Sequence, residues 1–244
     1  MVTCYDYCMA KILAATDIDS ILVGDSVAMV MYGHPNTIPA TVDMLVNHTG
    51  AVSKGAPNKF IVADLPFLSY RKSISNTLSN VEQLIRAGAQ AVKLEGADGN
   101  LETIHHIVES GIPVMGHIGL TIQHLHQLGG FRSQGADEAV AERLLQQAIQ
   151  LQQAGCFAIV LECIKYDVVQ RITDTLKIPT IGIGAGKCTD GQILVLQDLL
   201  GLYNDIHPRF VKQYCRGFDL IKEALNRYKM EVINEEFPES KHAY

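Results

Sequence analysis

Short apolar segments alternate with amphipathic helical patterns along most of the chain, and a glycine usually separates the two. Residues 75–87 are predicted to form a helix that ends before Gly88 and leads into an apolar segment at 91–94. The same order recurs with helices expected over 100–111, 137–155 and 167–177. A glycine directly after a helix can adopt the left-handed conformation that ends it, so these boundaries follow from local chemistry.

The apolar segments are predicted to be parallel β-strands that are covered on both faces. Seven strands are expected at 2–5, 21–24, 60–63, 91–95, 112–117, 157–162 and 179–184. An eighth is expected near 193–196, although this segment could equally open a helix. Eight β/α units in about 250 residues are typical of a (β/α)₈ TIM barrel, whereas an open doubly wound sheet usually has fewer strands. We therefore predict an α/β protein with a single (β/α)₈ barrel domain over 1–244 and a polar C-terminal tail at 231–244.

Composition narrows the class of protein. The chain has 244 residues, of which 48% are hydrophobic and 19% are charged, which provides a sizeable core and excludes intrinsic disorder. The formal net charge of −6 argues against a nucleic-acid partner, and no apolar run is long enough to span a bilayer. Six cysteines without a C-x-x-C pair indicate neither a disulfide scaffold nor a zinc site. We expect a cytoplasmic protein with no nucleic-acid or membrane partner.

Ionisable residues follow five of the predicted strands: Asp25, Asp64, Glu95, His117 and Glu162. All strands of a parallel barrel point the same way, so these side chains should meet at one mouth, where barrel enzymes place their chemistry. A single acidic residue after a strand is more often a cap or a turn residue. Four carboxylates at one rim repel each other, so they call for a cation, a shared proton or a function. Oxygen ligands of this kind suit Mg²⁺.

Lys93 lies two residues before Glu95 and therefore shares its face of the strand. It could form a structural ion pair, bind an anionic substrate group or form a Schiff base, and the sequence does not separate these roles. Three glycines at 182, 184 and 186 resemble a nucleotide-binding loop only weakly, because the spacing of G-x-G-x-x-G is not met.

Several motifs together resemble the ketopantoate hydroxymethyltransferase family of the phosphoenolpyruvate mutase/isocitrate lyase superfamily. They span nearly the whole chain, in order: Val23-Gly24-Asp25-Ser26, Ala63-Asp64-Leu65-Pro66-Phe67, Val92-Lys93-Leu94-Glu95-Gly96, Gly116-His117-Ile118-Gly119-Leu120-Thr121, Val160-Leu161-Glu162 and Ile181-Gly182-Ile183-Gly184-Ala185-Gly186. The resemblance implies a (β/α)₈ barrel that transfers a hydroxymethyl group from 5,10-methylenetetrahydrofolate to 3-methyl-2-oxobutanoate. Formation of the product, 2-dehydropantoate, is the first step of pantothenate biosynthesis.

The resemblance also implies a metal site and an assembly. Asp25 and Asp64 look like ligands of one Mg²⁺ per subunit, and Glu95 would join the site through a bound water. The resemblance also implies a homo-oligomer, which would be a decamer. The family usually has a helix before the first strand, whereas the first strand predicted here already begins at Val2, so we expect another cover, such as a neighbouring subunit, for that end of the barrel.

The remaining roles follow from the same resemblance. Ser26 and Lys93, together with the two aspartates, would hold the 2-oxo acid. Glu162 would be the catalytic base, by Mg-assisted enolate formation, and His117 is a possible supporting residue.

The chain departs from the family pattern at Ala28, where glycine is usual, at Ile122, where proline is usual, and at Ile164-Lys165, where Val-Pro is usual. None of these positions is a proposed ligand or base. The alternatives are another Mg-dependent 2-oxo-acid C–C lyase of the superfamily or a catalytically silent barrel that binds a ligand. The lyases use a cysteine in a Lys-Cys-Gly-His loop, and the comparable residues 116–119 contain none.

Overall fold

The computed structural model describes residues 1–124, 134–135, 137–203 and 208–244. The chain forms two compact units, Met1–Val195 and Leu196–Tyr244. The prediction of one domain over 1–244, with a polar tail at 231–244, stays a prediction.

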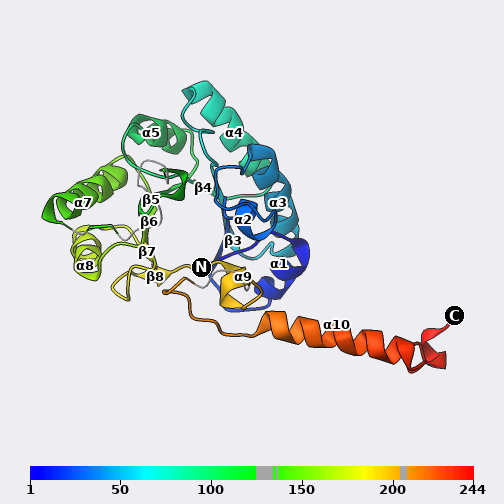
Figure 1. Cartoon of the computed structure of the whole chain (residues 1–244). Coiled ribbons are helices and arrows are strands. Elements are labelled where there is room, and N and C mark those ends of the chain that lie inside the picture. The colour runs from blue at the N-terminus through cyan, green and yellow to red at the C-terminus, as the bar shows by residue number, and fades with distance from the viewer. Residues whose placement is uncertain (125–133, 136, 204–207) are drawn as a thin grey trace. The chain divides into compact units, whose positions relative to one another are not determined.

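The first unit contains an eight-stranded parallel sheet whose strands pair in sequence order (Figure 1). The strands are β1 (Val2–Thr3), β2 (Ser20–Val23), β3 (Phe60–Asp64), β4 (Ala91–Lys93), β5 (Val114–Gly119), β6 (Ala158–Glu162), β7 (Thr180–Ile183) and β8 (Gly191–Gln192). The sheet closes where Val2 forms a parallel bridge with Leu194 and the Thr3 N–H donates to the Leu194 carbonyl oxygen over 3.1 Å. The predicted barrel is confirmed.

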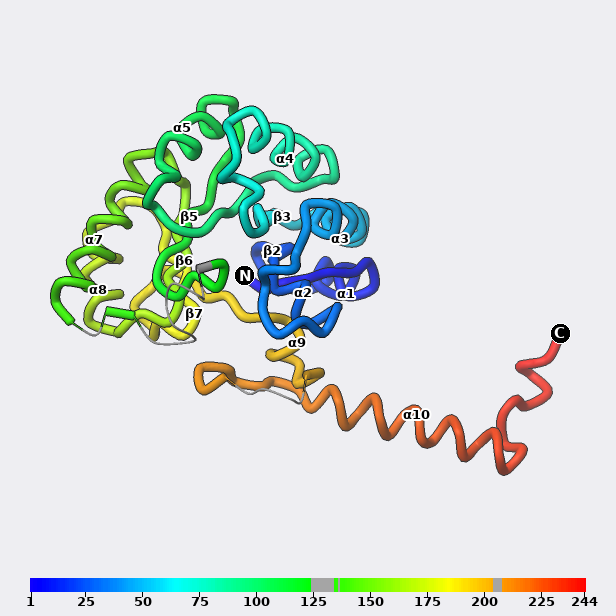
Figure 2. Tube along the Cα trace, turned by 45° about the horizontal axis from the view of Figure 1, so that its top comes forward, coloured from blue at the N-terminus to red at the C-terminus, as the bar shows by residue number. Residues whose placement is uncertain are grey.

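Helices surround this sheet, as the trace in Figure 2 shows for α3, α4, α5, α7 and α8. The helices of this unit are α1 (Tyr7–Ala14), α2 (Val27–Val30), α3 (Val42–Gly55), α4 (Ile74–Arg86), α5 (Leu101–Glu109), α7 (Glu138–Gln153) and α8 (Tyr166–Thr175), with a 3₁₀ helix η1 at Ile122–His124. The predicted helix boundaries hold because their chemistry is local. The Asp137 side chain caps α7 by accepting from the Val140 N–H over 2.9 Å. Gly88, Gly111 and Gly155 follow α4, α5 and α7 with positive φ.

The eighth strand lies at Gly191–Gln192, which is earlier than the predicted segment near 193–196. The Asp190 carboxylate fixes this position, because it accepts from both the backbone N–H and the hydroxyl of Thr180 on β7. Beyond the bridge at Leu194 the chain forms helix α9 (Leu196–Leu199), so the helical interpretation of that segment was correct for its end.

The barrel interior changes from apolar to polar along the strands. Seven buried residues form an apolar cluster inside it: Leu22, Val62, Ala91, Met115, Ala158, Val160 and Ile193. Side chains on one face of a strand recur every second residue. The next inward position after four of these residues is therefore polar, at Asp64, Lys93, His117 and Glu162. The apolar layer supplies hydrophobic stabilisation, and the polar layer lies at the carboxyl ends of the strands.

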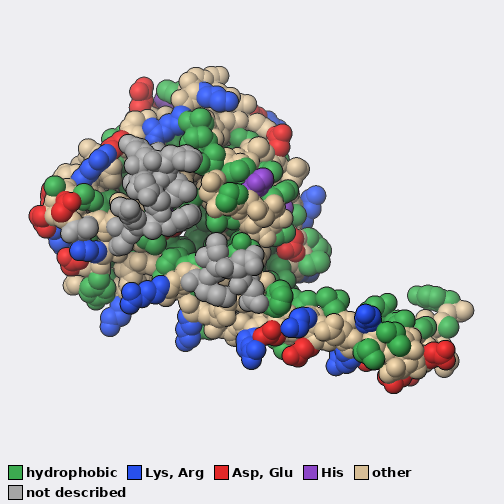
Figure 3. All heavy atoms as spheres, in the orientation of Figure 1, with side chains coloured by type: hydrophobic (Ala, Val, Ile, Leu, Met, Phe, Trp, Pro, Cys, Tyr) green, Lys and Arg blue, Asp and Glu red, His purple; other side chains and the backbone are tan. Residues whose placement is uncertain are grey.

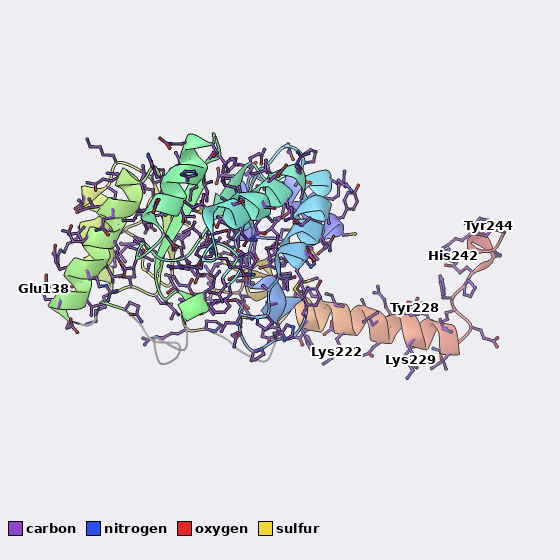
Figure 4. The ribbon with its side chains drawn as sticks, turned by 90° about the horizontal axis from the view of Figure 1, so that it is seen from above. Glu138, Lys222, Tyr228, Lys229, His242 and Tyr244 are labelled. Carbon is purple, nitrogen blue, oxygen red and sulfur yellow. The ribbon has the colours of Figure 1, made fainter. Side chains whose placement is uncertain are left out.

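The second unit consists of α9, α10 (Gly217–Ile233) and a 3₁₀ helix at Ser240–His242. Hydrophobic and charged side chains are interspersed along α10 (Figure 3). Lys222 and Lys229 extend from one side of this helix and Tyr228 from the other (Figure 4). In the described part of the chain, no helix combines the length and the apolar character needed to cross a membrane.

Candidate active site

A small cavity of about 80 Å³ lies at the carboxyl ends of the barrel strands. Its lining includes every candidate residue from the sequence: Asp25, Ser26, Asp64, Lys93, Glu95, His117 and Glu162. The parallel strands thus bring these side chains together from five segments of the chain, as predicted. Their individual roles stay predictions.

Asp64 and Lys93 form a buried ion pair on neighbouring strands. They are direct partners in the β3–β4 register, so their side chains lie on the same face of the sheet. The Lys93 Nζ donates to Asp64 Oδ1 over 2.6 Å. Burial alone would lower the pKa of Lys93, but the carboxylates of Asp64, Glu95 and Asp25 outweigh it and raise the pKa. Lys93 is therefore a cation and not a neutral amine.

Asp25 follows β2 and faces Asp64. Its backbone N–H donates to Asp64 Oδ2 over 2.9 Å, so both oxygens of Asp64 accept hydrogen bonds. Burial, followed by the negative charges of Asp64 and Glu95, raises the pKa of Asp25 well above its usual value. The positive charge of Lys93 and the hydrogen bond from Gln123 oppose this increase in the pKa but do not cancel it.

His117 on β5 lies between two carboxylates. Its Nδ1 is 3.2 Å from Glu95 Oε1 and its Nε2 is 3.3 Å from Glu162 Oε2, although neither contact has the angles of a hydrogen bond. Burial alone would lower the pKa of His117, but Glu95 and the contact with Glu162 raise it to about 9. Burial would raise the pKa of Glu95, but His117 and Lys93 lower it. His117 therefore lies between the two glutamates, and its raised pKa favours the charged imidazolium.

Two residues of the site were not among the candidates. The Tyr5 hydroxyl is buried and lies 2.6 Å from Ser26 Oγ, which orients the serine. Gln123 is 4% exposed and contacts Asp25 and Glu95. Neither an amide nor a phenol after a strand marks a site by its residue type.

The residues that depart from the family pattern do not replace or displace the polar side chains of the cavity. Ile122 lines the cavity with an apolar side chain, whereas Ala28 is buried in α2. Ile164 is buried against Gly119 at the end of β5. Glycines 182, 184 and 186 lead from β7 into the loop before β8 and not into a helix. They therefore lack the helix N-terminus that a dinucleotide site requires.

The donor set of the cavity fits a divalent cation. Among the described residues that line the cavity, four carboxylates face two cationic side chains, Lys93 and His117, so the negative charges outnumber the positive ones. A bound cation would favour the ionised form of Asp25, which burial and its neighbours disfavour. Within the described residues, no three His, Cys, Asp or Glu side chains are already arranged as a metal site. The carboxylates are instead held by Lys93, His117 and Gln123.

The ketopantoate hydroxymethyltransferase family model matches residues 1–240. The 3-methyl-2-oxobutanoate hydroxymethyltransferase of Bdellovibrio bacteriovorus is 54% identical over 244 residues, which cover 100% of this chain and 93% of that protein. The protein of the same name from Legionella pneumophila is 55% identical and covers 100% of this chain and 94% of its own length. The chain belongs to the ketopantoate hydroxymethyltransferase family. The predictions of this family and of a one-carbon transferase of pantothenate biosynthesis are confirmed.

Solved structures agree on the fold. A 2,3-dimethylmalate lyase of the PEP mutase/isocitrate lyase superfamily has a TM-score of 0.65 at 16% identity and covers 100% of this chain and 85% of its own. A phosphonopyruvate hydrolase, solved with oxalate and Mg²⁺, has a TM-score of 0.64 at 12% identity and covers 98% and 86%. Identities this low support a shared barrel and nothing more specific.

Proposed function

We propose that the cavity performs the reaction of its family with the residues named above. The reaction transfers a hydroxymethyl group from 5,10-methylenetetrahydrofolate to 3-methyl-2-oxobutanoate and yields 2-dehydropantoate. The observation that carries the proposal is the convergence of Asp25, Asp64, Glu95, Lys93 and Glu162 in one cavity.

Asp25 and Asp64 would hold one Mg²⁺, and Glu95 would support it through a water. Mg²⁺ supplies Lewis-acid polarisation of the 2-oxo group, which makes the C3 proton of the oxo acid more acidic. The binding of the metal requires Asp25 to be ionised. Both oxygens of Asp64 already accept hydrogen bonds, so their orientation is fixed before any ligand binds.

Lys93 and Ser26 would bind the oxo acid. Lys93 keeps its charge inside the barrel and can neutralise the substrate carboxylate. The Ser26 hydroxyl is held by Tyr5 and is available to the substrate in a defined orientation.

Glu162 would remove the C3 proton. Its side chain is 14% exposed, which leaves one edge of the carboxylate toward the cavity. His117 contacts its Oε2 and would orient the carboxylate, which is the supporting role expected from the sequence. The electron pair left at C3 would then form a C–C bond to the one-carbon unit of the folate. Over the whole reaction both C–N bonds of that unit break, water supplies the hydroxyl group, and the proton from C3 and the remaining proton of water complete the two N–H groups of tetrahydrofolate.

Two alternatives lose support. A Schiff base requires a neutral lysine, and the buried carboxylates keep Lys93 protonated. A C–C lyase of the superfamily would be expected to place a cysteine in residues 116–119, which read Gly-His-Ile-Gly. The sequence identity of 54% to the hydroxymethyltransferase also far exceeds the 16% to the lyase.

The test is an assay of the purified chain with 3-methyl-2-oxobutanoate and 5,10-methylenetetrahydrofolate. We expect 2-dehydropantoate to form with Mg²⁺, to disappear with EDTA and to return when Mg²⁺ is added in excess. Product formation that resists EDTA, or covalent trapping of the oxo acid on Lys93 by borohydride, would contradict the proposal.

The family resemblance further supports a homo-oligomer, which we propose to be a decamer. Light scattering after size-exclusion chromatography would measure its mass. A monomeric mass would contradict this assignment without affecting the chemistry.

A further inference from the structure

We propose that Gln123 is a positioning residue that fixes the distance and orientation of two carboxylates, Asp25 and Glu95, for a divalent cation. The inference rests on the proposed function, because it concerns how this chain prepares the metal site. Gln123 lies in η1, directly after β5, and is almost completely buried.

Gln123 contacts the two carboxylates through two different groups, its side-chain amide and its backbone N–H. The side-chain Nε2 of Gln123 donates to Asp25 Oδ2 over 2.8 Å, and its backbone N–H donates to Glu95 Oε2 over 3.0 Å. The two acceptors follow different strands, β2 and β4, and repel each other. A single neutral residue therefore holds the two carboxylates in place without adding a positive charge that would compete with a cation.

The surroundings of the amide determine which of its ends faces Asp25. The Tyr70 hydroxyl donates to Gln123 Oε1 over 2.7 Å. Nε2 also donates to the Leu65 carbonyl oxygen over 3.1 Å. A flipped amide would place its oxygen against two acceptors, the Asp25 carboxylate and the Leu65 carbonyl, and both contacts would be repulsive. The donating end must therefore point at Asp25.

This geometry distinguishes a positioning role from a packing role. Met at position 123 has nearly the same length and fills the same space, but it cannot donate to Asp25. The backbone N–H that contacts Glu95 remains in such a variant. Residues that orient metal ligands typically change metal affinity 10- to 100-fold when they are replaced. A residue that only fills space would instead change the melting temperature.

The experiment measures Mn²⁺ binding to the full-length, metal-free protein without substrates, by electron paramagnetic resonance of the free ion. Melting temperatures are measured in parallel. The variants are Gln123→Met, Tyr70→Phe, which removes the hydroxyl that orients the amide, and Gln146→Met as the matched control. Gln146 lies on α7 and bonds only the exposed Glu142 in the described contacts.

We expect Gln123→Met to raise the Mn²⁺ dissociation constant 10- to 100-fold and Tyr70→Phe to raise it several-fold. Gln146→Met should leave it unchanged, and the melting temperatures should stay within a few degrees of one another. An unchanged dissociation constant in folded Gln123→Met would overturn the inference. If that variant does not fold, Tyr70→Phe decides in the same way. Absence of Mn²⁺ binding by the unmodified protein would overturn the proposed metal site as well, so the two failures are distinguishable.

Discussion

The ammonium group of Lys93 and the carboxylate of Asp64 face each other at 2.6 Å inside the barrel, where both side chains are 5% exposed or less. Removing one partner of a buried ion pair leaves the other charge without compensation, which typically costs about 3–5 kcal/mol. We therefore expect Lys93→Met to lower the free energy of unfolding by about this amount, in addition to abolishing oxo-acid binding. Urea denaturation followed by circular dichroism measures the change.

The control for this variant is Arg86→Met on α4. Arg86 pairs with Glu82 at 2.7 Å, but both side chains are more than half exposed. Exposed pairs contribute little because water screens them, so the free energy of unfolding should hardly change. An equal decrease in the free energy of unfolding in the two variants would show that the buried Lys93–Asp64 pair contributes no more to stability than an exposed pair.

Glu162 should be needed for exchange of the C3 proton of the oxo acid with solvent deuterium. Glu162→Gln keeps the size of the side chain but removes the base, so we expect the exchange rate to fall by about 10²- to 10⁴-fold. Proton nuclear magnetic resonance of 3-methyl-2-oxobutanoate in deuterium oxide with Mg²⁺ measures this rate. The control variant is Glu142→Gln, on the exposed face of α7. It should catalyse exchange of the C3 proton at the rate of the unmodified protein. Full exchange in Glu162→Gln would remove Glu162 from the role of base.

Gly119 is required by close contact as well as by conformation. It has a φ of +101°, and a Cβ atom there would lie 2.2 Å from the Glu162 carbonyl oxygen. Gly111 also has a positive φ of +86°, but a Cβ there meets nothing within 4 Å. Gly111→Ala should cost about 1–2 kcal/mol for backbone strain alone, whereas Gly119→Ala should cost clearly more and displace Glu162.

Thermal denaturation and the exchange rate of the C3 proton together measure both effects of Gly119→Ala. A loss of stability no larger than that of Gly111→Ala, with a normal exchange rate, would show that the strand end can move away without consequence.

The thiols of Cys4 and Cys156 should be inert in the folded protein. Burial raises the pKa of Cys4 to about 11 and that of Cys156 to about 12, so almost no thiolate is present at pH 8. The exposed Cys8 should react first with iodoacetamide. Mass spectrometry of native and urea-unfolded protein after short labelling tests this order. Labelling of Cys156 at the rate of Cys8 without urea would contradict the burial of this thiol.

The sequence predicted most of the barrel because its signals are local. Asp137 at a helix start and Gly88 at a helix end act through their neighbours in the chain. The eighth strand was placed too late, because its position depends on Asp190 bonding Thr180 on another strand. Only the register of distant segments determines such a contact.

The candidate site likewise contains some residues that the sequence could identify and others that it could not. The carboxylates could be found because each one follows an apolar strand. Gln123 and Tyr5 could not be found by residue type, because their importance comes from the groups that surround them in space. Their contacts join segments far apart in the chain, which no periodic pattern records.

The seam between Val2 and Leu194 joins the first barrel strand to residues that follow the last one. During synthesis this seam forms only after nearly all of the barrel has left the ribosome. Until then, β1 has only β2 as a strand partner.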